Sequence, residues 1–160
     1  MALASNPKKC ICLVYERWYK NGMQVEFSAV PPDQIIYIWD KIAPLFEKLI
    51  QGQGYGSLEE MFDSLAIQKR NTLWIAWEKK NKDNILMVLS TRLVEGGAFE
   101  ILGCAGKDRY LWMDYFKTIE RFAKDSDCNR IQVRNGRRGW KRDLEKQGMK
   151  VTGYTFEKKI

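Results

Sequence analysis

The sequence contains no histidine and only four cysteines among its 160 residues. The absence of histidine removes the commonest general base and every Ser–His or Cys–His nucleophile pair. No CxxC pair is present either, so the usual zinc ligand sets cannot form and we expect no metal cofactor. We expect the cysteines to be reduced thiols with buried or half-buried side chains, and they are Cys10, Cys12, Cys104 and Cys128.

Long hydrophobic runs are also missing. No apolar stretch approaches the roughly 20 residues that span a bilayer, and the N-terminus MALASNPKKC lacks the apolar core of a signal peptide. We therefore expect a cytoplasmic protein without membrane contact. Repeats, linkers and low-complexity segments are absent, and 45% apolar and 12% aromatic content argues against disorder. A single domain over residues 1–160 is predicted.

The N-terminal half predicts a hairpin, two helices and two strands. Asn21-Gly22 between the apolar runs 9–19 and 23–30 is a strong hairpin signal, so residues 1–30 are predicted to be an N-terminal β-hairpin extension. Apolar residues at helical spacing follow from 35 to 49, and Pro44 predicts a kink or break in that helix. Residues 51–56 are rich in glycine but lack a following Lys-Ser/Thr, which favours a loop over a phosphate-binding loop.

Ser57-Leu58-Glu59-Glu60 is a capping box for a second helix. Residues 72–78 and 85–93 then have strand character and flank a charged turn at 79–84.

The stretch from Ala98 to Met149 organises the rest of the chain. It predicts a strand at 98–104, a glycine-containing turn, a helix at 110–124, a strand around 131–133 and a short helix stopped by Gly148. A helix between two strands implies that the strands are parallel neighbours with a right-handed crossover. The run from 150 to 160 alternates and predicts an edge or near-edge strand.

Together these elements predict an α+β fold with a mixed, mostly antiparallel sheet. Helices cover both faces, and the chain ends in a strand-helix-strand-helix-strand unit. A shared core is expected between the crossover helix, the strand after it and the last helix. Its predicted members are Trp112, Phe116, Ile119, Ile131, Val133, Trp140 and Leu144.

The positive charge is concentrated near the C-terminus. The chain carries a formal charge of +7, and residues 130–150 hold eight cations against two anions, a local excess of eight minus two, or +6. Such a cluster favours binding of an anion, either cofactor phosphate, nucleic acid or an acidic protein, while a solvated helix face is the alternative. The cations are Arg130, Arg134, Arg137, Arg138, Lys141, Arg142, Lys146 and Lys150.

The order strand, turn, helix, strand, followed by G-R-R-G-W-x-R-x-L-x-x-x-G-M, resembles the C-terminal half of the GNAT acyltransferase superfamily. The sequence looks closest to the short GNAT-like proteins of tailed bacteriophages, over residues 25–160. The resemblance implies a GNAT-like sheet whose central strands splay apart to admit acetyl-CoA. It also implies transfer of an acetyl group to an amine. For a phage-encoded protein, the expected location is the host cytoplasm, with the virion as a second location.

In the resembling family, backbone amides after the fourth strand bind the coenzyme A pyrophosphate, because unpaired N–H groups attract an anion and glycine allows its approach. The matching segment here has two glycines and two cations but not the family spacing Q/R-x-x-G-x-G/A. A plain strand-to-helix turn with Asp108 as N-cap is the alternative. Arg137 or Arg138 is a further candidate phosphate ligand, and Trp140 beside them is expected either to stack on a ligand or to fill the core. The candidate cofactor-binding residues are Gly103, Ala105, Gly106, Lys107, Arg109 and Arg137.

For catalysis the resemblance implies a carboxylate or ordered water as base and a tyrosine as acid. Glu100 is the candidate base, since it alternates away from Phe99 and Ile101, and a solvated or paired carboxylate is the alternative. The family's tyrosine position holds Leu144 in this chain, so Tyr154, or else Tyr110, is the candidate acid.

Two functions follow as hypotheses. The first is a GNAT-like N-acyltransferase that uses acetyl-CoA. The second is a catalytically inactive GNAT-fold bacteriophage protein, in the virion or at a host target, whose basic 130–150 surface meets DNA or an acidic protein. A sequence-specific DNA binder is disfavoured, because no reader motif is present.

Overall fold

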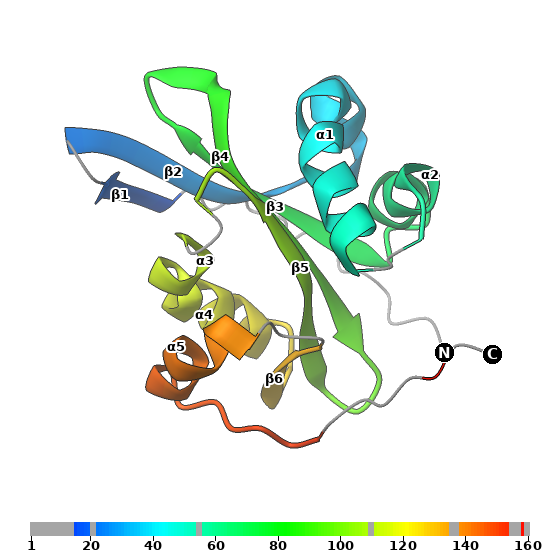
Figure 1. Cartoon of the computed structure of the whole chain (residues 1–160), viewed down its shortest axis with the longest axis vertical. Coiled ribbons are helices and arrows are strands. Elements are labelled where there is room, and N and C mark those ends of the chain that lie inside the picture. Colours follow the sequence, from blue (N-terminus) through cyan, green and yellow to red (C-terminus); the bar gives the residue numbers. More distant parts are fainter. Residues whose placement is uncertain are drawn as a thin grey trace.

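The computed structural model describes residues 15–19, 22–53, 56–108, 111–134, 138–153 and 158 (Figure 1). The strands are β1 (Tyr15–Tyr19), β2 (Met23–Val30), β3 (Asn71–Glu78), β4 (Asn81–Val94), β5 (Ala98–Gly106) and β6 (Arg130–Val133). The helices are α1 (Ile35–Gln53), α2 (Leu58–Phe62), α3 (Leu111–Asp114), α4 (Phe116–Asp125) and α5 (Lys141–Lys146). Short turns of 3₁₀-helix at Pro32–Gln34 and Arg138–Trp140 and of π-helix at Asp63–Ile67 adjoin them. None of the described helices is both long and apolar enough to cross a membrane.

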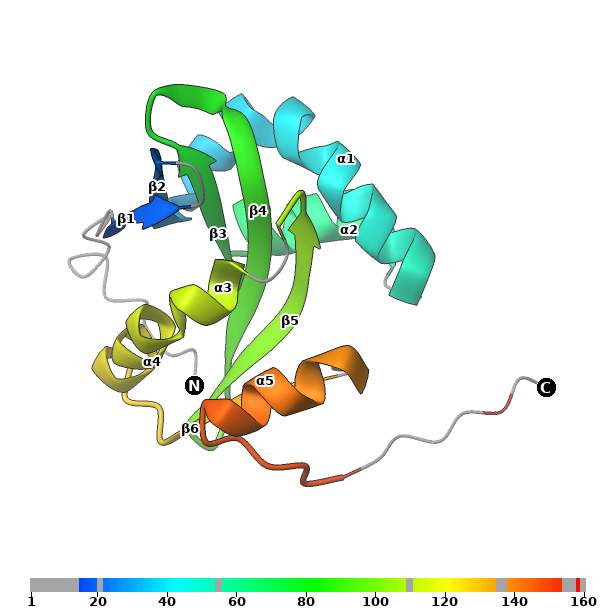
Figure 2. The ribbon, with the colours of Figure 1, turned by 60° about the vertical axis from the view of Figure 1, so that its left-hand side comes forward.

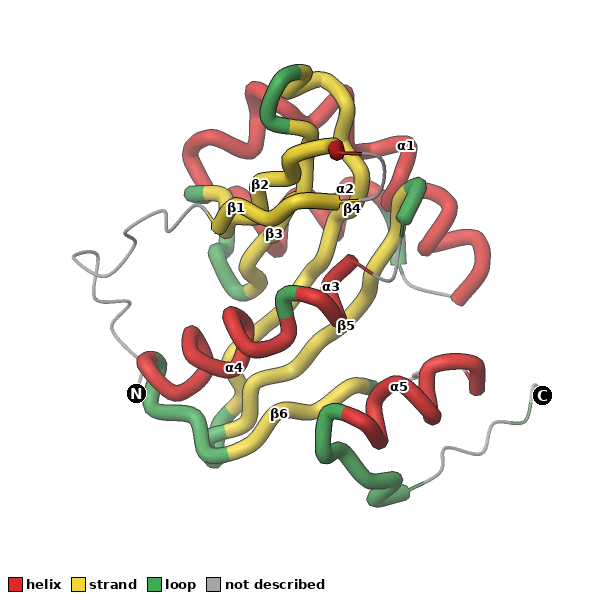
Figure 3. The backbone as a smooth tube through the Cα atoms, turned by 90° about the vertical axis from the view of Figure 1, so that its left-hand side faces the viewer, coloured by secondary structure: helices red, strands yellow, loops and turns green. Residues whose placement is uncertain are grey.

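The six described strands form one sheet in chain order, β1 to β6. Every neighbouring pair is antiparallel except β5 and β6, which are parallel and are joined through α3 and α4. Figure 3 shows β6 beside the first half of β5, with the α3–α4 crossover in front of the sheet. The antiparallel pairing of β1 with β2 and the parallel neighbours β5 and β6 are thus as predicted, whereas residues 1–14 of the predicted N-terminal hairpin extension lie outside the described residues.

Helices cover both faces of the sheet, as predicted (Figure 2). Helix α1 packs on β4 and β5, and α2 packs on α1. The apolar side chains of this layer enclose one buried cluster around Phe46, Leu49 and Val88. Helices α3 and α4 lie on the opposite face, where a second cluster gathers around Phe27, Leu89 and Ile119.

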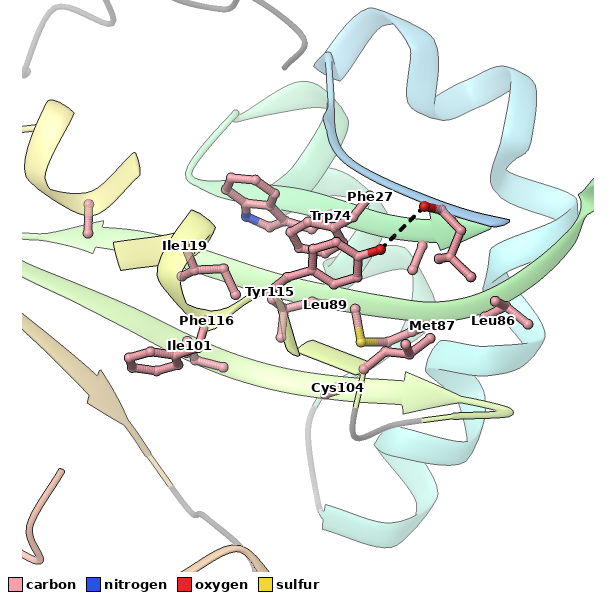
Figure 4. Packing of buried hydrophobic residues seen from close by; sticks show 14 of the residues in the cluster. Phe27, Trp74, Leu86, Met87, Leu89, Ile101, Cys104, Tyr115, Phe116 and Ile119 are labelled. Atoms are coloured by element: carbon pink, nitrogen blue, oxygen red, sulfur yellow. Dashed lines mark hydrogen bonds between the residues drawn. The ribbon is translucent and has the colours of Figure 1, made fainter. Parts of the chain in front are cut away.

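Stacked aromatic rings fix the second cluster. The rings of Phe27 and Tyr115 are stacked with centroids 4.5 Å apart, and Phe27 also stacks on Trp74 at 5.3 Å (Figure 4). Their polar atoms are satisfied inside the core, because Trp74 Nε1 donates to Thr91 Oγ1 at 3.0 Å and the Tyr115 hydroxyl donates to the Val25 carbonyl oxygen at 3.4 Å. This arrangement ties the crossover helix to β2 and β3.

A β-bulge bends β5 in its middle. Ser90 of β4 pairs with Gly103, while the next residue, Thr91, pairs with Ile101, so Leu102 is the extra residue on β5. The ladder between β5 and β6 ends at Ile101 and Val133, one residue before this bulge, although β5 continues to Gly106. A bulge re-aims a strand and increases its twist. The two neighbouring strands β5 and β6 therefore pair along only the first part of β5.

Several predicted boundaries differ from the structure. The crossover helix is divided at Tyr115 into α3 and α4, and β4 begins at Asn81 rather than at 85. Helix α1 runs through Pro44 without a break. The predicted strand at 150–160 is not formed in its described part, since residues 150–153 and 158 have no regular structure, and residues 154–157, 159 and 160 lie outside the described residues. Alternation alone does not make a strand where no neighbour supplies a ladder.

Only some members of the core predicted between the crossover helix, β6 and the last helix are fully buried. Phe116, Ile119 and Trp140 are buried in the second cluster, whereas Ile131, Val133 and Leu144 are only partly buried against it. Helix α5 has six residues and buries no side chain fully. The side chain of Trp112 lies outside the described part of the structure.

Candidate functional site

A pocket of about 320 Å³ opens between the α1–α2 layer and the sheet. The helix side contributes Leu49 of α1 together with Ser57 and Glu60 at the start of α2. The sheet side contributes side chains of β4, the bulge of β5 and Arg134, which directly follows β6. The pocket therefore lies where β5 and β6 stop pairing.

The capping box at the start of α2 shapes one wall. Ser57 Oγ accepts from the Glu60 backbone N–H at 3.1 Å, and Glu60 Oε2 accepts from the Ser57 N–H at 3.1 Å, as the sequence predicted. Two orphan N–H groups of the helix end are satisfied by this pair of bonds. The Glu60 carboxylate is thereby held at the pocket.

Glu100 lies beneath the opposite wall, with its side chain 0% exposed. Arg92 Nε donates to Glu100 Oε2 at 2.6 Å, and Arg134 Nε forms an ion pair with Glu100 Oε1 that is not aligned as a hydrogen bond. A buried carboxylate needs such partners, because its desolvation is not otherwise offset. Glu100 is therefore a paired carboxylate in this structure, and its role as a general base remains a prediction.

Strand pairing brings these three residues together. Arg92 on β4 is directly opposite Glu100 on β5, and Glu100 is opposite Gln132 on β6, two residues before Arg134. Side chains two residues apart on a strand share a face, so Arg134 follows Gln132 to the same side. The result is a row of cation, anion and cation across three strands.

The candidate cofactor-binding glycines lie in β5 rather than in the turn after it. Gly103, Ala105 and Gly106 all pair with β4. A Cβ atom on Gly103 would be 2.5 Å from Leu49 Cδ2, and one on Gly106, which has φ +140°, would be 2.3 Å from the Leu86 carbonyl oxygen. At both positions a larger side chain would collide with neighbouring atoms of this chain, which explains why each position holds glycine. Phosphate approach is not needed to account for either of them.

The turn that does follow β5 begins at Lys107. Lys107 Nζ donates to Asn84 Oδ1 at 2.6 Å, and the Asp108 N–H donates to the Leu86 carbonyl oxygen at 3.1 Å. The Leu111 N–H in turn donates to the Asp108 carbonyl oxygen at 3.3 Å. These bonds hold the turn against β4 at the start of α3.

Four predicted site residues, Arg109, Tyr110, Arg137 and Tyr154, lie outside the described residues.

The cations of residues 130–150 do not all point to one surface. Arg134 binds Glu100 at the pocket, and Arg130 Nη1 donates to the Gly96 carbonyl oxygen at 2.6 Å. On α5, Lys141 and Lys146 form ion pairs with acidic neighbours on the same helix. Arg138, Arg142 and Lys150 are exposed. The local excess of charge is thus divided among a pocket, a turn and a helix surface.

Neither described cysteine forms a disulfide; Cys104 is buried and Cys128 is half-buried. Burial, with a smaller contribution from the charge of Asp127, raises the pKa of the Cys128 thiol. Cys10 and Cys12 lie outside the described residues.

Reading the sequence missed the pocket residues of β4, namely Ser90 and Arg92. A signal for Arg92 was present, because the Glu95-Gly96-Gly97 turn between two strands aligns Arg92 with Glu100. Arg134 was identified only as part of a basic cluster, since its partner on β5 lies 34 residues earlier.

No protein-family model matches the chain, and no curated protein matches it in sequence. Solved structures do resemble it. An aminoglycoside acetyltransferase from an uncultured soil metagenomic sample, in complex with sisomicin, has a TM-score of 0.57 at 11% identity, over 84% of this chain and 97% of that one. A glucosamine-6-phosphate N-acetyltransferase from Arabidopsis thaliana has a TM-score of 0.58 at 12% identity, over 84% and 97%. A predicted acetyltransferase with acetyl-CoA from Clostridium acetobutylicum has a TM-score of 0.60 at 11% identity, over 84% and 96%.

At such low identity these likenesses concern the fold. All three structures cover most of this chain with TM-scores of 0.57 to 0.60, so they share its overall fold. The chain therefore has a GNAT-like α+β fold, as its order of strands and helices predicted.

Proposed function

We propose that the chain is an N-acyltransferase that transfers an acetyl group from acetyl-CoA to the nitrogen of an amine. The observation that carries this proposal is the position of the pocket at the end of the β5–β6 ladder, within a fold found in acetyltransferases. Ligands of open α/β sheets commonly bind where neighbouring strands separate. One neighbour of this fold is described with acetyl-CoA.

The residues present suit a thioester donor in one respect. Strand β5 runs from Gly103 to Gly106 beyond its ladder with β6, and a strand edge can bind an extended ligand through backbone amides and carbonyls. Acetyl-CoA would supply the acetyl thioester there. Lys107, just beyond the strand, and the predicted ligands Arg109 and Arg137 would bind its phosphates.

The reaction exchanges one bond for another. The amine nitrogen forms a bond to the acetyl carbon, the carbon–sulfur bond breaks, the amine loses a proton and the thiolate gains one. Glu100, or a water that it orients, is our candidate for accepting the amine proton, and Tyr154 is our candidate for protonating the thiolate. Because both oxygens of Glu100 contact an arginine, we favour a water at the pocket as the direct acceptor.

Calorimetry with acetyl-CoA tests the proposal. A working site should bind with a micromolar or tighter dissociation constant, roughly −8 kcal/mol, and release thiol when amines are added. Charge reversal at Lys107 should weaken binding, whereas the same reversal at Lys80, an exposed lysine of the β3–β4 turn, should not. Absence of binding at millimolar acetyl-CoA would overturn the proposal.

The alternative of an inactive phage virion or host-interaction protein rests on the resemblance to phage GNAT-like proteins and on the basic 130–150 stretch. Among the described cations of that stretch, Arg130, Arg134, Lys141 and Lys146 already have partners within the protein, which leaves Arg138, Arg142 and Lys150 as exposed cations for an external anion. We therefore favour the acyltransferase, and the salt dependence of DNA binding separates the two functions.

A further inference from the structure

We infer that the pocket selects an acceptor amine that carries an anionic group, and that Arg92 and Arg134 bind this group. The inference rests on the proposed acyltransferase function and adds the chemical class of its acceptor. It is carried by the way in which Glu100 holds the two guanidinium groups.

Both arginines contact Glu100 through Nε. A guanidinium has five N–H donors, so each arginine keeps the four donors of its Nη groups. Among the described residues, the structure gives these Nη groups no acceptor. The Arg92 side chain is 40% exposed and that of Arg134 is 62% exposed, and both line the pocket. The donors are therefore accessible to a ligand.

Glu100 also holds both arginines at the pocket, Arg92 by a hydrogen bond and Arg134 by an ion pair. Its side chain is fully buried, so its position is set by the sheet, and each oxygen holds one guanidinium. Less side-chain entropy is then lost when a ligand binds, because the donors are already positioned. The two cations exceed the one anion by +1 at the sheet wall of the pocket, while the Glu60 carboxylate lies on the helix wall. A carboxylate or phosphate is the complementary group, and Arg binds both in a bidentate manner.

A second observation comes from Ser90. Its side chain is 1% exposed, it lines the pocket, and its Oγ has no hydrogen-bond partner among the described residues. A buried hydroxyl without a partner is unfavourable, so such a group in a pocket indicates a polar ligand. Ser90 is opposite the β5 bulge at Gly103, while Arg92 lies two residues farther along β4.

The pocket thus has two polar ends, separated by two strand residues or roughly 7 Å. The bulge end adjoins the β5 segment proposed for the donor, so the amine nitrogen is expected there, near Ser90. The anionic group is expected at the arginine end. A volume of about 320 Å³ admits a small molecule of this kind, at the lower end of the range for ligand pockets.

Rates with matched acceptors test the inference. We would compare amino acids of increasing amine-to-carboxylate distance with their carboxamides, which keep the amine and lose the charge, and with aminoalkyl phosphates. The expected kcat/KM ratio of acid to amide is about tenfold or more for at least one pair, as for a charged hydrogen bond. A preference for the phosphates would equally support the anion site and would assign it to phosphate. Turnover of amines with no preference for an anion would overturn the inference while the proposed function stands.

Arg92→Lys and Arg134→Lys keep a cation for Glu100 but lose the guanidinium fork. We expect each to lower the acid-to-amide ratio toward one, with the change in KM rather than kcat. Arg121→Lys is the matched control, since Arg121 is exposed on α4 across the sheet, and its ratio should equal that of the unaltered protein. Unchanged ratios in both pocket variants would also overturn the inference.

A direct binding measurement needs no turnover. N-acetylglycine and its carboxamide would be titrated into protein labelled with ¹⁵N at the arginine side chains. The expected result is a shift of the Nε–H signals of Arg92 and Arg134 with the acid alone. If neither signal shifts with up to roughly 10 mM of the acid or of phosphoethanolamine, the inference is overturned, even if no amine turns over. Failure to bind acetyl-CoA would instead overturn the proposed function.

Discussion

Arg92 Nε lies 2.6 Å from Glu100 Oε2, and the two residues are direct cross-strand partners on β4 and β5. The carboxylate is fully buried, whereas the guanidinium is 40% exposed to solvent. This asymmetry has an energetic consequence: loss of the arginine leaves a buried charge with a single cation, while loss of the carboxylate leaves two arginines that water can reach.

We therefore expect Arg92→Met to destabilise the fold more than Glu100→Gln does. Removal of one partner of a fully buried pair costs about 3–5 kcal/mol, and solvent access at the arginines lowers our expectation to about 2 kcal/mol for Arg92→Met. Urea unfolding measures both values. A larger loss for Glu100→Gln would show that the carboxylate contributes mainly by holding the arginines.

Gly103→Ala should destabilise the protein by about 1–3 kcal/mol, because its Cβ would lie 2.5 Å from the Cδ2 atom of the buried Leu49. Leu49→Ala alone should cost about 2–5 kcal/mol through the cavity that it leaves. The double variant should lose less than the sum, since the new methyl group occupies part of that cavity. Gly153→Ala is the control, with nothing within 4 Å of its Cβ. Additive losses would contradict the contact.

Leu144→Ala should lower the free energy of unfolding by about 1–2 kcal/mol, because the Leu144 side chain is only half-buried against the core. Trp140→Ala should cost about 3–5 kcal/mol, since Trp140 is 4% exposed. Equal losses for the two variants, measured by thermal or urea unfolding, would mean that α5 packs more tightly than the structure shows.

Cys128 should react slowly with iodoacetamide near pH 8. Burial raises the pKa of its thiol, so less of the reactive thiolate is present at a given pH than for an exposed cysteine. Because the raised pKa favours the protonated form in the folded state, the related contribution to stability is present at neutral pH and is lost as the pH rises through the folded-state pKa. Mass spectrometry of single sites checks the rate, with urea-unfolded protein as the fast reference. Equal rates in the two states would contradict the prediction.

Simultaneous reversal of Arg138, Lys141 and Arg142 to Glu tests the basic stretch. We expect acetyl-CoA affinity to stay nearly unchanged, because Arg138 and Arg142 lie on an exposed helix surface and Lys141 already pairs with Glu145. Calorimetry and DNA binding at several salt concentrations measure the two properties. Steeply salt-dependent DNA binding that this variant loses would favour the alternative function, since each phosphate neutralised by a cation releases a counterion.

Local patterns in the sequence determined most of the fold. The β1–β2 hairpin around Asn21-Gly22, the capping box of Ser57 and Glu60, and the strand-helix-strand order of β5 to β6 all follow from neighbouring residues. Turn geometry, capping and hydrophobic period each depend on residues within about one helical or hairpin turn, so they can be read from one chain. Even the cross-strand pairing of Arg92 with Glu100 could be derived from the short turn between their strands.

Only the tertiary structure decided the site. The bulge at Leu102 depends on how β5 pairs with β4, and the contact of Arg134 with Glu100 depends on where β6 docks. The same holds for Gly103 and Gly106, because the contacts that a Cβ atom would make with Leu49 and with the backbone of β4 cannot be read from the sequence. Residues 150–153, which alternate like a strand, have no ladder. Such outcomes depend on contacts between residues far apart in the chain, whose register no local pattern encodes.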